Sequence, residues 1–259
     1  IQVVAVGSVG KWSEQMMTHC ADHTDLISEH FYCRDKKNLL EHVRQIPNRV
    51  KRIADAHRGY RKRFDSLKGK DIRIALDEWN YWYGAHVFGE LGTRYFMQDA
   101  LGVAAGLHEY FRNSDIIFMA NYAQTVNVIG CIKTTKTAAA FAATGLPLCL
   151  YRNHFGVTPV AIEGDYGNLD IACAWTADKK KLTVGIVNAT MEKHSISLDV
   201  QGAGLSGKGI MYVIEHEDRM AYNEPGKKPR IAINKYAVFN AGKLTSPPIS
   251  VVVYELPVK

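Results

Sequence analysis

A short stretch of the chain brings together two carboxylates and several aromatic rings. In DIRIALDEWNYWYG, residues 71–84, an apolar run ends in Asp77 and Glu78. Four aromatic residues follow directly: Trp79, Tyr81, Trp82 and Tyr83. A carboxylate here can act as a nucleophile or as a general acid or base, and aromatic faces beside it can cover the C–H surface of a sugar. The stretch predicts either a catalytic carboxylate in an aromatic-lined pocket or a strand end whose rings cover an edge of the core.

Polar side chains also gather where two other apolar runs end. The run at 25–32 ends in Ser28, Glu29, His30 and Tyr32. The run at 115–124 ends in Asn121 and Gln124. Amide, imidazole and phenol groups hydrogen-bond sugar hydroxyls, so this set suits a hydroxyl-rich substrate. His30 keeps an alternative interpretation as a histidine of the hydrophobic core.

The elements that must position these residues follow a regular alternation. Four nearly continuous apolar runs, typical of strands buried on both faces, cover residues 1–7, 25–32, 71–79 and 115–124. Helical patterns follow them at 13–21, 38–64, 93–112 and 136–154. We expect Ser13 to cap the first helix, Pro47 to interrupt the second and Gly145–Pro147 to kink the last. The alternation predicts right-handed βα units, and a (β/α) barrel places its active site at the carboxyl ends of such strands.

The chain changes character after about Val157. Six short segments with alternating apolar residues follow, separated by turns rich in Gly, Asp and Lys. Such spacing predicts an antiparallel β-sandwich, and we interpret residues 223–226 as one of its turns. We therefore predict two parts, four βα units at 1–156 and an all-β domain at 157–259. Since no long linker divides them, the two parts should pack together.

Composition excludes several classes of protein. The chain has 259 residues, of which 47% are hydrophobic and 22% charged, as in ordinary soluble domains. The formal charge of +6 is concentrated in a basic stretch at 49–73, which we interpret as a solvated helix face and not as a nucleic-acid site. Five scattered cysteines without a CxxC pair argue against a disulfide framework or zinc ribbon and favour a reducing compartment, the cytoplasm. No apolar run is long enough for a membrane helix, and His19 and His23 lack an evident third metal ligand.

The block DEWNYWYG at 77–84 closely resembles the nucleophile segment of glycoside hydrolase family 51, the α-L-arabinofuranosidases. Three more blocks fall in that family's order: SEHFY at 28–32, ANYAQTVNVIG at 120–130 and LYRNHFG at 150–156. The resemblance implies a TIM (β/α)8 barrel followed by a jelly-roll-like β-sandwich. It further implies hydrolysis with retained anomeric configuration, no cofactor or metal, and assembly into homo-oligomers.

The same resemblance implies roles for individual residues. Glu78 is the expected nucleophile, and Asp77 is the expected hydrogen-bonding residue of the strand end. The expected sugar-binding residues are His30, Tyr32, Trp82 and Gln124, with Asn121 as a weaker candidate. The implied activity is exo-acting release of arabinose from arabinan- or arabinoxylan-type glycans.

One departure from the family pattern limits what residues 1–259 can do alone. The family's acid/base glutamate follows Asn in a Gly-Asn-Glu sequence at the end of the fourth barrel strand, and this chain has no such motif. We expect its strands to be the fifth to eighth of a barrel, its partner to be the missing N-terminal half, and the fragment alone to be inactive. Two alternatives stay open: another retaining barrel glycosidase, such as a xylosidase or endo-glucanase, and a non-catalytic carbohydrate-binding module.

Overall fold

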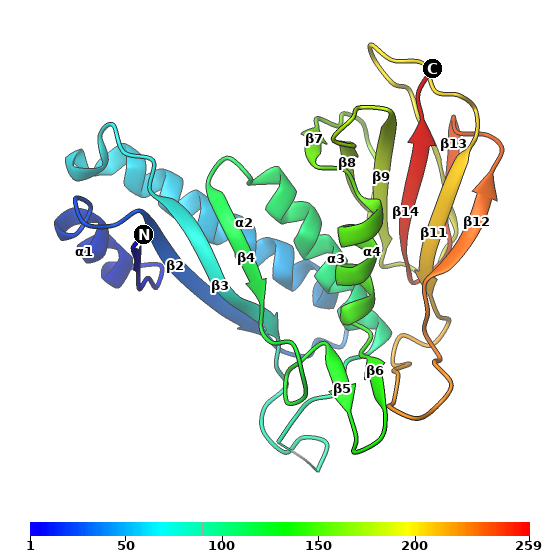
Figure 1. Cartoon of the computed structure of the whole chain (residues 1–259), viewed down its shortest axis with the longest axis horizontal. Coiled ribbons are helices and arrows are strands. Elements are labelled where there is room, and N and C mark those ends of the chain that lie inside the picture. The colour runs from blue at the N-terminus through cyan, green and yellow to red at the C-terminus, as the bar shows by residue number, and fades with distance from the viewer. Residues whose placement is uncertain (90) are drawn as a thin grey trace.

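Four parallel strands form the first sheet, in the sequential order β1-β2-β3-β4. They are β1 (Val4–Ala5), β2 (Leu26–Cys33), β3 (Arg73–Tyr81) and β4 (Ile117–Tyr122). The structure is a computed structural model that describes residues 1–89 and 91–259 (Figure 1). The strands lie where the apolar runs predicted them, and their order and direction are those of consecutive βα units.

Helices pack against one face of this sheet (Figure 1). They are α1 (Lys11–His19), α2 (Leu39–Arg63), the 3₁₀ helix η1 (Asp65–Leu67) and α3 (Met97–Arg112). A last helix, α4 (Gly145–His154), contacts α3 and the antiparallel strands described below. The predicted cap of the first helix is wrong, because α1 begins two residues earlier, with Gly10 at the N-cap. Ser13 is instead buried inside α1, where its hydroxyl donates to Glu29 Oε1 at 2.8 Å.

The predicted interruption of the second helix at Pro47 is also wrong. Helix α2 starts after Asn38, whose side chain accepts a hydrogen bond from the Glu41 N–H at 3.0 Å, and it continues through Pro47. A proline costs a helix one backbone hydrogen bond. Here the turns on both sides bury Val43, Ile46 and Val50 in the core, and this burial outweighs the loss.

The last predicted helix, 136–154, is correct only in its second half. A short hairpin of β5 (Ile132–Thr134) and β6 (Ala139–Phe141) occupies the first part, and α4 begins at Gly145. The Thr135 N–H donates to the Ala138 carbonyl at 2.8 Å and closes the hairpin turn. The alanine run suggested a helix, but pairing with residues 132–134 satisfies its backbone in an extended form.

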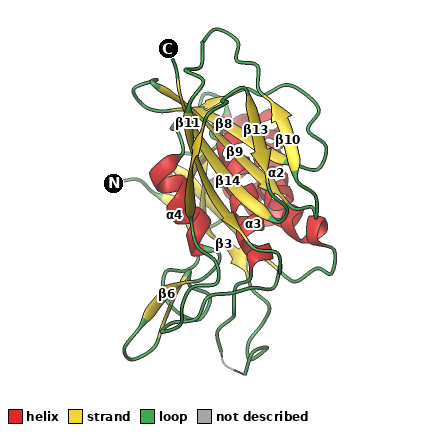
Figure 2. Cartoon of the chain, turned by 90° about the vertical axis from the view of Figure 1, so that its right-hand side faces the viewer, coloured by secondary structure: helices red, strands yellow, loops and turns green. Residues whose placement is uncertain are grey.

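Eight further strands build the antiparallel part (Figure 2). Six form one sheet in the order β12-β11-β14-β9-β8-β7. Their bounds are β7 Thr158–Val160, β8 Asp170–Trp175, β9 Lys181–Asn188, β11 Gly209–Glu215, β12 Asn234–Val238 and β14 Ser250–Pro257. The pair β10 (His194–Ser197) and β13 (Lys243–Ser246) packs over one face of this sheet through a core that includes Leu244 and Val252.

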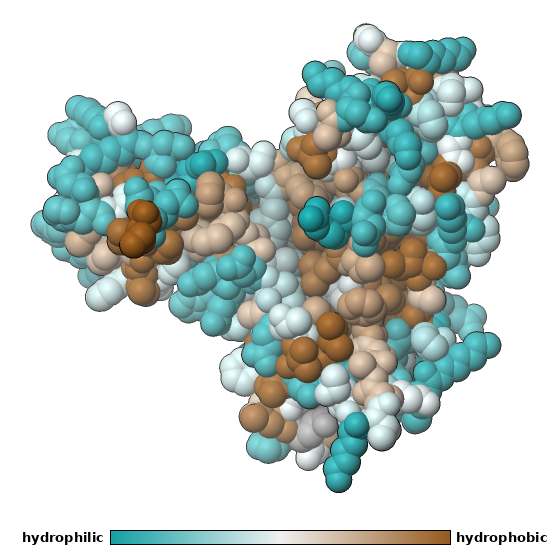
Figure 3. Space-filling model, viewed as in Figure 1, coloured by the Kyte–Doolittle hydropathy of each residue, from teal (hydrophilic) through white to brown (hydrophobic). Residues whose placement is uncertain are grey.

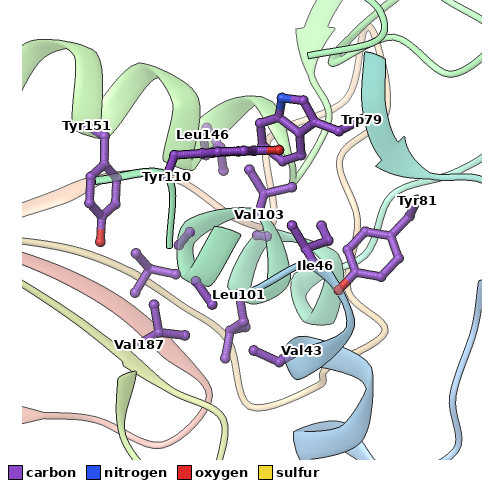
Figure 4. Packing of buried hydrophobic residues seen from close by; sticks show 14 of the residues in the cluster. Val43, Ile46, Trp79, Tyr81, Leu101, Val103, Tyr110, Leu146, Tyr151 and Val187 are labelled. Carbon is purple, nitrogen blue, oxygen red and sulfur yellow. The ribbon is translucent and has the colours of Figure 1, made fainter. Parts of the chain in front are cut away.

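The other face of the six-stranded sheet shares a hydrophobic core with the βα part. Trp79 of β3, Leu101 of α3, Leu146 of α4 and Val187 of β9 belong to one cluster of buried residues (Figure 4). Helix α3 lies at its centre, in contact with α2, with α4 and with strands of the antiparallel sheet. Gly102 permits this approach, since a Cβ there would lie 1.9 Å from the Tyr81 hydroxyl. The division at residue 156 stays a prediction, because one core spans both sides of it.

A polar cluster joins α3 to β8 beside this core. The imidazole of His108 contacts Asp170 at 2.7 Å and the Tyr151 hydroxyl, while Arg112 Nη2 donates to Asp170 Oδ1 at 2.6 Å. Burial lowers the pKa of His108, and the hydrogen bond to Asp170 opposes this only in part. Burial also disfavours the Asp170 carboxylate, but the hydrogen bonds and charges of His108 and Arg112 prevail and lower its pKa to about 2.

The basic stretch forms an exposed face of α2 and the segment after it. Ion pairs join Arg58 to Asp115 at 2.6 Å and Arg61 to Asp71 at 2.9 Å. These pairs bring much of the local positive charge close to carboxylates. None of the helices in the described part of the chain combines the length and hydropathy needed to cross a membrane.

Candidate active site

Three of the predicted site residues form a row across the sheet. The rings of Phe31, Trp79 and Tyr122 stand in register on neighbouring strands and pack on the helix side. Because side chains alternate along a strand, the residue before each of them faces the opposite side. Those residues are His30, Glu78 and Asn121, and all three are exposed. This register brings them together on the free face of the sheet and excludes the interpretation of His30 as a core histidine.

A β-bulge shapes the strand at the two carboxylates. Glu29 pairs with Leu76 and His30 pairs with Glu78, so Asp77 is an extra residue in β3. Bulges are frequent next to active sites, where they redirect a side chain. Asp77 is exposed, and none of the side-chain hydrogen bonds among the residues that the structure describes involves its carboxylate. Its expected hydrogen-bonding role is therefore absent there, and the bulge itself accounts for its position.

Tyr32 binds the candidate nucleophile directly. Its hydroxyl, on β2, donates a hydrogen bond of 2.7 Å to Glu78 Oε2 on β3. Burial and then the neighbouring Glu78 carboxylate raise the pKa of Tyr32 well above its usual range. The phenol therefore stays protonated and acts as the donor to the Glu78 carboxylate, which this contact holds in one orientation.

Trp82 forms a wall beside this pair. The Trp82 and Tyr32 rings meet edge to face, with ring centroids 6.0 Å apart, and the backbone N–H of Trp82 donates to the Cys33 carbonyl at 2.8 Å. The indole is 39% exposed, so part of its face stays available to a ligand. An exposed aromatic face next to a carboxylate is suited to the apolar side of a sugar ring.

Gln124 lies in the loop that follows β4. Its backbone carbonyl accepts from the Cys131 N–H at 3.0 Å, and its side-chain amide donates to the Val126 carbonyl at 3.2 Å. The side chain is exposed and makes no hydrogen bond to Glu78. The structure thus places Gln124 just beyond Asn121, at the same ends of the strands.

Sequence reasoning missed Asn80, which holds this loop in place. Asn80 is fully buried, and its amide donates to the Ala123 carbonyl at 2.6 Å and to the Ile129 carbonyl at 2.8 Å. It also contacts the Tyr95 hydroxyl at 2.6 Å. Asn80 stands two residues after Glu78, so one strand carries both the candidate nucleophile and the anchor of the neighbouring loop. A polar residue among four aromatic ones was the available signal.

A second missed network fixes the loop after β3. The Tyr83 hydroxyl donates to Asp99 Oδ1, and the Phe96 N–H donates to Asp99 Oδ2 at 2.7 Å. The same carboxylate contacts His42 Nε2 at 2.9 Å, and the His42 ring stacks on Tyr81 at 4.5 Å. The loop that carries Trp82 is thereby attached to both α2 and α3.

Glu29, one of the polar residues noted at the end of the second run, lies away from this site. It is 2% exposed, and its carboxylate accepts from the Val9 N–H at 2.9 Å and contacts His57 Nε2 at 2.8 Å. These contacts join β2 to the segment before α1 and to α2. Glu29 is therefore part of the folded scaffold.

The described residues contain no group of three or more His, Cys, Asp or Glu side chains placed to hold a metal ion. His19 and His23 are exposed at and just beyond the end of α1. All five cysteines are free thiols.

A parallel βα sheet with a carboxylate, polar groups and an aromatic wall at its strand ends, joined to an antiparallel sandwich, is the architecture of barrel glycoside hydrolases. The family model of the alpha-L-arabinofuranosidase C-terminal domain matches residues 77–250, and the chain belongs to this family. The resemblance drawn from DEWNYWYG is thereby confirmed.

Individual relatives agree with this assignment. The chain is 25% identical over 266 residues to an intracellular exo-alpha-(1->5)-L-arabinofuranosidase 1 of Bacillus subtilis, covering 88% of this chain and 52% of the relative. It is 30% identical over 175 residues to a probable alpha-L-arabinofuranosidase C of Aspergillus flavus, covering 60% and 34%. The chain thus spans about half or less of the length of these relatives.

Solved structures share the fold over the whole chain. The alpha-L-arabinofuranosidase of Thermotoga maritima, in complex with arabinose, aligns with a TM-score of 0.86 at 24% identity, covering 99% of this chain and 58% of that one. The GH51 enzyme of Thermotoga petrophila aligns with a TM-score of 0.83 at 24% identity, covering 98% and 57%. The predicted combination of βα units and an antiparallel sandwich is therefore confirmed.

Proposed function

We propose that the complete protein is a retaining, exo-acting α-L-arabinofuranosidase that releases arabinose from arabinan- or arabinoxylan-type glycans. The contact between Tyr32 and Glu78 carries this proposal. It supplies a hydrogen-bonded carboxylate at a strand end, in a family whose members are named for this activity. The Bacillus subtilis relative is named an exo-acting enzyme, which supports an exo mode of attack.

Glu78 would attack the anomeric carbon of arabinose while the bond to the leaving oxygen breaks. That oxygen takes a proton from a second carboxylic acid, which later removes a proton from water as water displaces Glu78. We propose that the acid/base glutamate and the first half of the barrel lie outside residues 1–259. The sheet supports this, because β1 and β4 are its edge strands, and Val4, Val6 and Phe118 are exposed on or beside them. Figure 3, in the same view as Figure 1, shows apolar patches on the face turned toward the viewer.

The neighbours of Glu78 would bind the sugar. Asn121 and His30 stand in the same row and can hydrogen-bond the ring hydroxyls, as can Gln124 beyond them. Tyr32 would hold the carboxylate in position, and Trp82 would cover the apolar face of the sugar.

Nucleophile replacement in the complete enzyme tests this function. We expect Glu78→Ala to lower kcat on 4-nitrophenyl α-L-arabinofuranoside by more than about 10⁴-fold. Azide should restore turnover, because it can attack from the face that Glu78 leaves and form an arabinosyl azide of inverted configuration. The neighbouring Asp77→Asn is the matched control and should keep most of the activity. Full activity of Glu78→Ala without azide contradicts the proposal.

The same assay separates the alternatives. A xylosidase would prefer the β-xyloside of the nitrophenyl series, an endo-glucanase would prefer internal bonds of a polymer, and a binding module would hydrolyse none of them. Assembly into homo-oligomers and the cytoplasmic location remain predictions for the complete protein. The word "intracellular" in the name of the Bacillus subtilis relative supports that location.

A further inference from the structure

A pocket of about 510 Å³ lies among the loops that follow β3 and β4, and its lining is separate from the candidate site residues. Three segments surround it: the loop between β3 and α3, the loop and hairpin after β4, and the loop between β11 and β12. They lie at the end of the molecule toward which β3 and β4 point (Figure 1). The volume is within the range of about 300–1,000 Å³ that small-molecule sites occupy.

Its walls are held by buried contacts. The Thr93 N–H donates to the Val128 carbonyl at 2.8 Å, and a Cβ on Gly92 would lie 2.8 Å from the same carbonyl, so the first two segments meet closely. Asn223, which we interpreted only as part of a turn, is 8% exposed. It joins the hairpin after β4 to the loop between β11 and β12. Its amide donates to the Phe141 carbonyl at 3.3 Å and to the Ile231 carbonyl at 2.8 Å. The pocket is therefore largely formed before any ligand arrives.

One lining residue connects the pocket to Glu78. Tyr95 lines it, and the Tyr95 hydroxyl contacts Asn80, two residues after Glu78 on β3. The Tyr95 hydroxyl also donates to the Ile129 carbonyl at 3.0 Å, in the loop that carries Gln124. The side chains of Tyr95 and Asn80 are both buried, so their contact fixes the pocket wall to the strand that carries Glu78.

Arg94 gives the pocket its chemistry. Its guanidinium lies 5.6 Å from the Phe88 ring centroid and 5.4 Å from that of Tyr222, and these two rings restrict its plane. Its one recorded hydrogen bond goes to the neutral Tyr222 hydroxyl at 3.3 Å, and no carboxylate in the described part of the chain pairs with it. The lining carboxylate of Glu224 is paired with Lys227 at 2.8 Å. Arg94 thus keeps donors that match a carboxylate in a fork geometry.

We propose that this pocket binds an acidic sugar, a uronate, within the aglycone part of the substrate. The proposal rests on the proposed function, because it assigns a class of substrate to the loops at the same end of the parallel sheet. The uronate carboxylate would pair with Arg94, and the Tyr222 ring would contact its C–H surface. The complete enzyme would then prefer arabinose side chains that stand near a charged branch.

Paired substrates test this preference in the complete enzyme. One is a xylo-oligosaccharide carrying arabinose, and the other is the same oligosaccharide with an added glucuronic acid branch. We expect the ratio of kcat/KM, acidic over neutral, to exceed one in the wild type. Arg94→Gln should lower that ratio about tenfold, as expected for loss of a charge-assisted hydrogen bond. Arg94→Lys should lower it less, since the charge remains and the fork geometry is lost.

The matched control is Arg52→Gln, which removes an equal charge from an exposed position on α2. It should leave the ratio unchanged. An unchanged ratio in Arg94→Gln, or an equal fall in Arg52→Gln, overturns the acidic subsite while the arabinofuranosidase assignment stands. If the wild type hydrolyses neither substrate, the proposed function fails. Calorimetric titration of glucuronoxylo-oligosaccharide into the wild type and Arg94→Gln then decides the pocket alone, and equal affinities overturn it.

Discussion

The Tyr32 hydroxyl on β2 donates a 2.7 Å hydrogen bond to Glu78 on β3, although the two residues are 46 positions apart in the chain. Their strands are parallel neighbours, and the bulge at Asp77 sets the register that makes this contact. The pair links the position of a proposed nucleophile to the neighbouring βα unit. Its contribution can be measured by removing the hydroxyl alone.

We predict that Tyr32→Phe lowers kcat of the complete enzyme by about tenfold to a hundredfold, because Glu78 loses the donor that orients it. Steady-state kinetics on a nitrophenyl arabinofuranoside measure the effect. Tyr236→Phe on β12 is the control, since Tyr236 is 49% exposed and lies on the antiparallel sheet. Equal kinetics for Tyr32→Phe and the wild type would show that the contact has no catalytic role.

Trp82→Ala should raise KM about tenfold, or ~1.4 kcal/mol, while kcat changes less. The indole face contributes to binding in the ground state and in the transition state alike, because it contacts the sugar ring and not the reacting bond. Trp12→Ala on α1 removes another exposed indole, which is 56% exposed, and serves as the control. A fall in kcat with unchanged KM contradicts a binding role.

Asn80→Ala should destabilise the protein by about 1–3 kcal/mol, since the Ala123 and Ile129 carbonyls lose their donor in a buried place. We also expect kcat/KM to fall by more than the loss of folded protein explains, because the loop that carries Gln124 loses its hydrogen bonds to Asn80. Urea denaturation and kinetics at a temperature far below the midpoint separate the two effects. Asn240→Ala, in an exposed turn, should change neither quantity.

Stability should depend on pH through Asp170. The pKa of Asp170 is about 2 in the folded protein and 3.8 in a model peptide, so the folded state favours its ionised form. The contribution, about 2 kcal/mol, is present above pH ~4 and is lost as pH falls toward ~2. Asp170→Asn should flatten the fall in unfolding free energy over this range, measured by chemical denaturation. Asp199→Asn, at an exposed position, should keep the wild-type slope.

Much of the fold was predictable because its signals are local. Continuous apolar runs marked β2, β3 and β4, and alternation marked the antiparallel strands. Two of the three errors in the helices have clear tertiary causes. Pro47 lies inside α2 because the buried turns on both sides outweigh its lost hydrogen bond, and residues 139–141 pair with β5 despite their alanine content.

The candidate site was predictable by residue type but not by geometry. Glu78, Tyr32 and Trp82 could be chosen from sequence, whereas the row formed with His30 and Asn121 depends on register between strands and on a bulge. Asn80 escaped notice because two of its partners are backbone carbonyls more than 40 residues away. Sequence patterns report which face a residue occupies, and they do not report distant partners.

Helix α3 has thirteen of its sixteen residues buried, with the parallel sheet on one side and the antiparallel sheet near the other. Neither sheet can be removed without exposing this helix to water. The antiparallel part therefore completes the core of the βα part and is not an independent module. Deletions or domain exchanges at the junction after His154 should yield insoluble protein. The two parts should also occur together in related proteins.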